Sequence, residues 1–187
     1  MEGFVKALIS GVLVMIFGAV VMFIKWVRGD YDEKNIKAII DEVNDEIRSE
    51  EKGKLVAINE EIKAYPNDPI SYFTRGKVKS NLEDYDSALA DFNKAIDLDP
   101  NNAFYYFYRG VAKWELKNKN GAETDFNEAI ANFDEAMKVN PNFANNYKYR
   151  GLAKKYLGLQ LAACNDWQKA ADLGDEDAAK WVRDECN

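Results

Sequence analysis

Few side chains in this sequence of 187 residues could carry out chemistry, because it contains no histidine and only two cysteines, Cys164 and Cys186. Without histidine, the usual general acid/base groups, Ser-His and Cys-His nucleophiles and most zinc, copper and iron sites are excluded. Glycine-rich phosphate loops, the nucleophile-elbow motif and the EF-hand loop do not occur either. We therefore expect no enzyme, no metal site and no cofactor.

The two cysteines could instead form a disulfide. They lie at equal distances before and after Asp175, which follows a helix-stopping glycine. In an antiparallel helical hairpin they would face one another, and they could bond if their Cα atoms came within ~7 Å. A disulfide would indicate an oxidising compartment, whereas two reduced, buried cysteines would not, and both outcomes are open.

The charged side chains exclude one class of partner. The chain has 25 Lys and Arg against 32 Asp and Glu, a net charge of −7. Nucleic-acid binding requires clustered basic residues, so no nucleic acid partner is expected. The carboxylates are spread along helix-like segments, where we expect them to be solvated.

An uncharged stretch from Ala7 to Ile24 lies near the start of the sequence. As a helix it would span roughly 27 Å, about the thickness of a bilayer's hydrocarbon core. A lysine, a tryptophan and an arginine follow it, as in an interfacial anchor. Residues 1–29 are thus predicted to be a single-pass transmembrane anchor, rather than a cleaved signal peptide or a buried core helix.

One face of this predicted anchor carries Ala7, Gly11 and Gly18, with Val14 between them. Small residues let helices pack closely in lipid, so the face could contact a second copy or a larger membrane complex. The alternative is that the glycines are merely typical of transmembrane helices. The flanking charges favour, by one charge, a cytoplasmic repeat domain at a bacterial inner membrane, whereas a disulfide would favour the periplasm.

Residues 30–54 are predicted to be an amphipathic helical linker. Its apolar stripe consists of Ile36, Ile39, Ile40, Val43 and Ile47. The Ser-Glu-Glu-Lys-Gly-Lys segment at 49–54 should interrupt this helix. The stripe could fold onto the rest of the chain or pair with another chain, and the sequence favours neither.

The remainder of the chain is repetitive. Tyr72, Tyr106 and Tyr147 each begin a Tyr-x2-Arg-Gly-x2-Lys motif, and the second interval between them is longer than the first. Each copy is followed by Ala-x3-(Phe/Trp)-x2-Ala, beginning at Ala88, Ala122 and Ala163. Apolar positions at helical spacing indicate pairs of amphipathic helices, which must stack to bury their stripes.

Seven extra residues separate the second and third copies, and the matching spacings locate them in the second helix of repeat two. The segment from Asp125 to Ala129 is nearly echoed by the segment from Asn132 to Ala136. Seven residues are about two turns, so the apolar stripe stays in phase while the helix lengthens by roughly 10 Å. We predict one unbroken helix from about Gly121 to Val139, with repeat three displaced along it to open a notch. A kink is the alternative.

These repeats resemble the tetratricopeptide repeat (TPR), a 34-residue helix–turn–helix unit. Gly76, Gly110 and Gly151 match its helix-A glycine, whereas Arg and Lys replace its usual Leu and Tyr. The resemblance implies an all-α fold, with the single N-terminal transmembrane helix followed by a TPR-like α-α superhelix over residues 55–187. Its parts would be a half-repeat (55–66), repeats at 69–102, 103–143 and 144–174, and a C-terminal capping helix (175–186).

In this family a partner peptide or helix lies in a concave groove, which is lined by each first helix. Carried over by position, the partner-binding residues would be Phe73, Thr74, Lys77, Phe104, Phe107, Tyr108, Val111, Lys148, Tyr149 and Leu152. Chaperone-binding members of the family hold a terminal carboxylate with a clamp that includes an Asn. This sequence has no Asn at 74, 108 or 149, so that clamp is not expected here. The groove would instead be aromatic, with a lysine towards each end, and suit an apolar helix or extended segment, unless the rings pack against the next helix.

The layout is similar to that of N-terminally membrane-anchored members of the family. It implies a protein–protein interaction scaffold or assembly factor that recruits another protein to a membrane. The alternative is a structural accessory subunit, in a homo-oligomer or a larger membrane complex, held mainly through its transmembrane helix.

Overall fold

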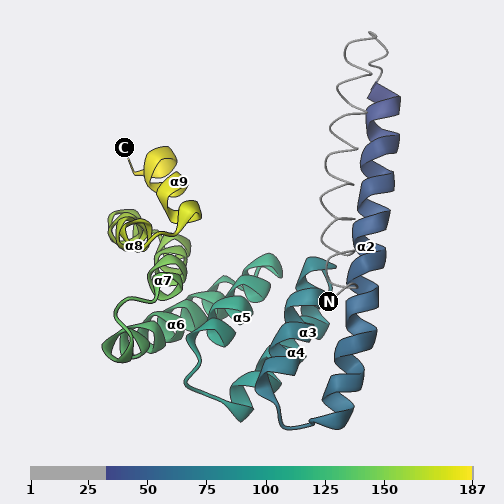
Figure 1. Cartoon of the computed structure of the whole chain (residues 1–187), viewed down its shortest axis with the longest axis horizontal. Coiled ribbons are helices and arrows are strands. Elements are labelled where there is room, and N and C mark those ends of the chain that lie inside the picture. The colour runs from purple at the N-terminus through teal and green to yellow at the C-terminus, as the bar shows by residue number, and fades with distance from the viewer. Residues whose placement is uncertain (1–32, 187) are drawn as a thin grey trace. The chain divides into compact units, whose positions relative to one another are not determined.

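The computed structural model describes residues 33–186, and every regular element in that range is a helix (Figure 1). The bounds are α2 (Glu33–Ala64), α3 (Pro69–Asn81), α4 (Tyr85–Leu98), α5 (Ala103–Glu115), α6 (Lys119–Val139), α7 (Ala144–Tyr156), α8 (Gln160–Asp172) and α9 (Glu176–Glu185). The predicted anchor at 1–29 lies outside the described residues. None of the helices within 33–186 is both long and apolar enough to cross a membrane.

The chain divides into two compact units, residues 1–50 and 51–187, and α2 passes through the boundary as one helix of 32 residues. The predicted interruption at 49–54 is therefore wrong. Gly53 costs only about 1 kcal/mol in a helix interior, and its Glu and Lys neighbours are good helix formers. Lys54 also pairs with Glu51 at 2.9 Å. In the predicted apolar stripe, Val43 is half-buried and Ile47 is exposed. That the stripe packs on the rest of the chain or on another chain stays a prediction.

Several helices of the second unit begin at a short polar side chain that caps them. Asp68 accepts hydrogen bonds from the amides of Ile70 (3.2 Å) and Ser71 (2.8 Å), and Pro69 is the first residue of α3. Three further caps also accept amide hydrogen bonds, and they are Asp84 for α4, Asn102 for α5 and Asp175 for α9. These short polar side chains satisfy backbone donors that the helix leaves unpaired.

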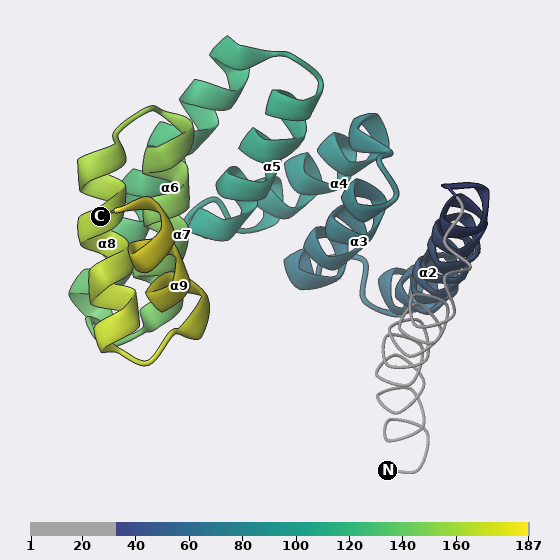
Figure 2. The ribbon, with the colours of Figure 1, turned by 90° about the horizontal axis from the view of Figure 1, so that it is seen from above.

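The pairs α3/α4, α5/α6 and α7/α8 stack one on the next, and α9 covers the last (Figures 1 and 2). Within each pair, the first helix has a glycine where a ring of the second comes close. A Cβ atom at Gly76 would lie 2.6 Å from the Phe92 ring, and one at Gly151 would lie 2.5 Å from the Trp167 indole nitrogen. The glycines therefore allow the two helices of each pair to pack closely.

A repeated ion cluster joins the helices of each pair and was not predicted. The arginine of the Arg-Gly motif donates two hydrogen bonds to an aspartate 16 residues later, and the motif lysine pairs with the same carboxylate. These aspartates are Asp91, Asp125 and Asp166. All three are buried, so the expectation of solvated carboxylates is wrong here, because two cations neutralise each one.

The arginines also set the register between repeats. Arg75 and Arg109 each donate to an asparagine 16 residues earlier, Asn59 and Asn93, at 2.8 Å. In repeat three, the residue that Arg150 contacts in this way is Asp134 on α6.

Helix α6 is continuous over 21 residues, which confirms the predicted unbroken helix. Without the insertion, the regular repeat period would have placed Asn127 where Asp134 now meets Arg150. Repeat three therefore docks two turns further along α6, a displacement of roughly 10 Å.

A disulfide joins Cys164 of α8 to Cys186 at the end of α9, with Cα atoms 5.7 Å apart. Beside it, the rings of Trp167 and Trp181 lie 5.3 Å apart. The last two helices are thus linked both covalently and by packing.

Candidate functional site

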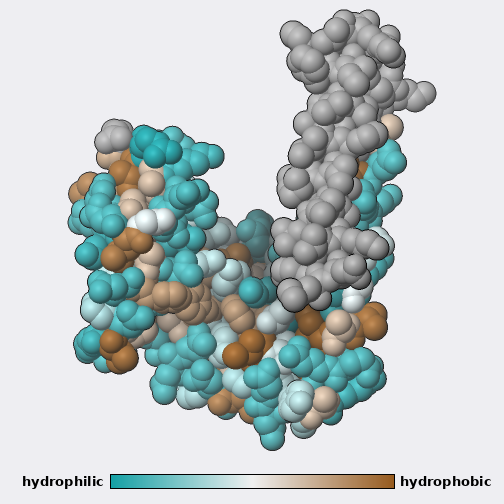
Figure 3. Space-filling model, in the orientation of Figure 1, coloured by the Kyte–Doolittle hydropathy of each residue, from teal (hydrophilic) through white to brown (hydrophobic). Residues whose placement is uncertain are grey.

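The first helices of the three pairs bring four aromatic rings into a chain of contacts, which we call the aromatic strip: Phe73, Tyr108, Tyr149 and Phe104. The ring centroid of Tyr108 lies 5.3 Å from that of Phe73 and 6.0 Å from that of Tyr149. Tyr149 continues the chain to Phe104 at 5.2 Å. All four rings are half-buried, and Figure 3 shows hydrophobic side chains gathered over α5 to α7.

Phe107 does not belong to this strip, although the sequence placed it in the groove. It is only 4% exposed, and Tyr149 and Tyr156 of α7 contact its ring, with centroids 5.2 and 6.4 Å away. The prediction is wrong at this position because α7 covers the ring. Val111 and Leu152 are half-buried and pack against the same core.

The two tyrosines of the strip are joined through their hydroxyl groups, which lie 3.1 Å apart. Burial raises the pKa of Tyr108, and the hydrogen bond with Tyr149 raises it further. Tyr108 therefore stays a neutral phenol, suited to hydrogen bonding rather than to ionic chemistry.

Lys77 is the cation of the strip. Its ammonium nitrogen lies 4.8 Å from the ring centroid of Phe73 and 5.8 Å from that of Tyr108. Within residues 33–186 it forms no ion pair. Thr74, also on α3, is half-buried. The chemistry available on this face is recognition by stacked rings, phenol hydroxyls and one ammonium group.

Lys148, the second predicted groove lysine, is already paired. Its ammonium group lies 2.7 Å from Asp175 and 3.4 Å from Asp177, both at the start of the capping helix. Burial lowers the pKa of Lys148, but hydrogen bonds to these two carboxylates raise it overall. Lys148 thus attaches α9 to α7, whereas Lys77 stays a predicted groove residue.

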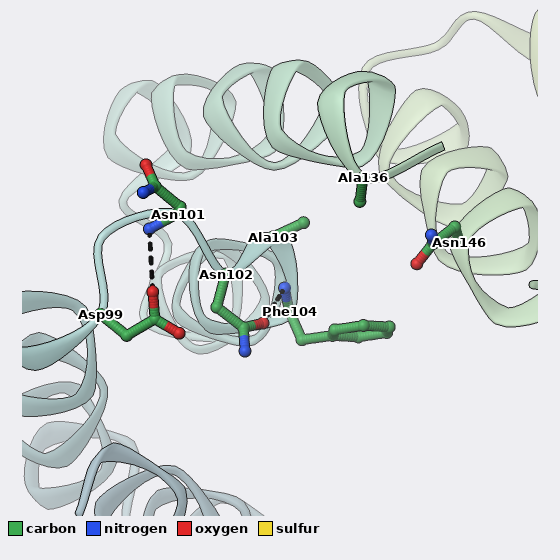
Figure 4. A pocket seen from close by; sticks show the side chains of 7 residues that line it. All are labelled: Asp99, Asn101, Asn102, Ala103, Phe104, Ala136 and Asn146. Carbon is green, nitrogen blue, oxygen red and sulfur yellow. Dashed lines mark hydrogen bonds between the residues drawn. The ribbon is translucent and has the colours of Figure 1, made fainter. Parts of the chain in front are cut away.

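A pocket of about 330 Å³ opens beside Phe104 (Figure 4). The lining residues are Asp99, Asn101, Asn102, Ala103, Phe104, Ala136 and Asn146. It lies between the α4–α5 loop and the displaced α7, where the insertion indicated a notch, yet sequence reasoning named only Phe104 of its lining. No group of three or more Cys, Asp and Glu that could hold a metal ion occurs in the described part of the chain.

Comparisons with known proteins agree with this architecture. The family model of the tetratricopeptide repeat matches residues 69–102, so this segment is a TPR unit. No curated protein matches the chain in sequence.

Among solved structures, a double mutant of MamA from RS-1 is 23% identical, with a TM-score of 0.50 over 72% of this chain and 73% of that one. MamA 41-end from Desulfovibrio magneticus RS-1 is 22% identical, with a TM-score of 0.50 over 71% and 72%. The first TPR of Spaghetti (RPAP3), bound to an HSP90 peptide, is 25% identical, with a TM-score of 0.48 over 64% and 90%. The two MamA structures establish the fold as an all-α, TPR-like superhelical arrangement.

Proposed function

We propose that this protein is a membrane-anchored scaffold, which holds a segment of a partner protein against the aromatic strip. The strip itself is the observation that carries the proposal, because its rings come from all three first helices and stay half-buried. Together they offer apolar area that one helix pair could not provide. Large aromatic side chains of this kind are typical anchors for an apolar helix or an extended segment.

Lys77 narrows the chemistry of that segment. Its charge lies over two rings and has no carboxylate partner within 33–186. A segment with apolar side chains for the rings and one carboxylate near Lys77 would satisfy both features. A strongly acidic segment would be repelled, since the chain carries a net charge of −7.

Membrane attachment rests on the uncharged stretch from Ala7 to Ile24, which is long enough to cross a bilayer as a helix. The disulfide between Cys164 and Cys186 supports a repeat domain on the oxidising side of that membrane. It outweighs the cytoplasmic location favoured by a single flanking charge. A maleimide reagent should label both cysteines of denatured protein after reduction and neither before it. Labelling without reduction would contradict this location.

Photo-crosslinking in native membranes tests the proposed site. Benzoyl-phenylalanine would replace Thr74 or Lys77 beside the strip, and the exposed Glu123 on α6 as a matched control. We expect one discrete adduct from each strip position and none from Glu123. No adduct from the strip positions, or equal capture at Glu123, would contradict the proposal.

A fourth probe at Val14 separates this function from an accessory subunit that is held through its anchor. Adducts from Val14 in the absence of adducts from the strip would show that the anchor makes the main contact. The scaffold function would then be wrong.

A further inference from the structure

The pocket beside Phe104 occupies a place that a tyrosine fills elsewhere in the same chain. Tyr105 and Asn146 hold the same position in successive repeats, and so do Ala95 and Ala136. Tyr105 lies at the junction of repeats one and two, and Asn146 lies at the junction of repeats two and three. The two junctions can therefore be compared residue by residue.

At the first junction, the phenol ring closes the space between the repeats. Tyr105 is 2% exposed, packs with Ala95 and Ile96, and lies 4.9 Å from the ring of Phe73. Burial raises the pKa of Tyr105, and the nearby carboxylates of Asp99 and Asp68 raise it further. The ring is thus held as a neutral phenol whose polar end faces a polar loop.

At the second junction, asparagine replaces that ring and the space stays open. Asn146 is 5% exposed, yet its side chain forms no hydrogen bond within residues 33–186. Figure 4 shows Asn146 and Ala136 on one side of the pocket, with Phe104 and Asn102 on the other. Asn102 holds the repeat position of Asp68, so the polar loop is preserved at the end of the pocket.

The size and the lining of the pocket can accommodate a side chain. A volume of about 330 Å³ is at the lower end of the range of ligand pockets. Phe104 and Ala136 offer an apolar wall, while Asn102, Asn146 and Asp99 offer acceptors and donors for a hydroxyl group. A phenol combines an apolar ring with one hydroxyl, as Tyr105 does at the equivalent junction.

We propose that this pocket binds the tyrosine side chain of a partner protein, which inserts between repeats two and three as Tyr105 inserts between repeats one and two. The inference goes beyond the scaffold function, because it concerns a pocket between repeats two and three that Thr74 and Lys77 do not line. It does not require the identity of the partner.

The test is an amide NMR titration of the full chain in a mild detergent, with N-acetyl-tyrosinamide as the probe. We expect saturable shifts confined to the amides of residues 99–104, 136 and 146, with a dissociation constant in the millimolar range. N-acetyl-phenylalaninamide, which lacks the hydroxyl group, should bind about tenfold more weakly. Asn146→Tyr should fill the pocket, weaken the tyrosine probe at least tenfold and raise the melting midpoint by about 3 °C.

Ala136→Leu fills the pocket from α6 and repeats the test if Asn146→Tyr does not fold, which circular dichroism would reveal. Glu123→Ala, on the exposed face of α6 and outside the pocket, is the matched control and should keep the tyrosine probe bound. Undiminished binding in a folded filled variant, equal affinity for the two derivatives, or shifts confined to the amides of Phe73, Tyr108 and Tyr149 would overturn the proposal. A failure here leaves the scaffold function standing, since that is tested by crosslinking at Thr74 and Lys77.

Discussion

Asp125→Asn is expected to lower the free energy of unfolding of the repeat domain by about 3 kcal/mol. Asp125 is 1% exposed, and its oxygens accept hydrogen bonds from Arg109 Nε at 2.9 Å and Nη2 at 2.7 Å. The ammonium group of Lys113 lies 2.7 Å from the same carboxylate. Asparagine has the same shape but no charge and one oxygen, so two cations would be left together without an anion.

The magnitude follows from the burial of the three groups. Removing one member of a buried ion pair costs about 3–5 kcal/mol. The Arg109 and Lys113 side chains are each about one-fifth exposed, so water compensates part of the loss, and the low end of that range applies. With a urea m-value of about 1.5 kcal/mol per molar, the unfolding midpoint should fall by about 2 M.

Asp134→Asn is the matched control. Asp134 is 49% exposed and binds Arg150 at the repeat position where Asn59 and Asn93 serve the other arginines. Its replacement should cost less than about 0.5 kcal/mol. Both variants would be unfolded with urea as full chains in a mild detergent, and circular dichroism would follow the helices. A free energy of unfolding for Asp125→Asn within about 0.5 kcal/mol of the wild type, or an equal loss in the control, would show that the buried carboxylate does not hold the helix pair together.

Three further outcomes concern backbone packing, the disulfide and pH. Gly76→Ala should lower stability by about 1–3 kcal/mol, because its Cβ would lie 2.6 Å from a ring of α4. Gly53→Ala should raise the free energy of unfolding by about 0.5–1 kcal/mol, because its Cβ would have no atom within 4 Å. Equal urea midpoints for the two variants would contradict both predictions. Reducing the Cys164–Cys186 disulfide, which spans 22 residues, should cost about 3 kcal/mol, whereas the double serine variant should not respond to reductant. Burial raises the pKa of Asp175, but hydrogen bonds from a lysine of α7 and from the α9 backbone lower it overall. Its stabilisation is therefore complete above the unfolded pKa of about 3.9 and is lost as the pH falls through the lower folded pKa, so the tryptophan fluorescence of α9 should change there in the wild type and less in Asp175→Asn.

Local features of the fold could be predicted because they depend on neighbours along the chain. Asp68 and Asn102 cap helices through amides two or three residues away. The insertion could be located because the spacings on either side of it keep the regular repeat period. The predicted interruption near Gly53 was wrong because one weak helix former was given more weight than the strong helix formers around it.

Contacts between helices were harder to predict, although one signal was present. The pairs Arg75/Asp91, Arg109/Asp125 and Arg150/Asp166 recur at a spacing of 16 residues. Residues 16 positions apart do not contact each other within one helix. They can meet only when two helices pack side by side in opposite directions. The burial of Phe107 had no such signal, because it depends on how α7 docks.

The length of the insertion connects the core to the pocket. Seven residues rotate the apolar stripe of α6 by only about 20°, so both echoed segments face the same side. The first segment serves its own repeat, since Phe126 packs close to Gly110. The second segment contacts the start of α5 in its own repeat, where Phe133 lies 5.0 Å from Phe104, and repeat three, where Asp134 binds Arg150. Repeat three therefore keeps its contacts with α6 although it lies two turns further along that helix. The junction of repeats two and three nevertheless lacks the close packing that Tyr105 provides between repeats one and two. The packing of this domain does not require an open junction, because one tyrosine closes the junction of repeats one and two, and the pocket is therefore free to take the proposed tyrosine of a partner protein.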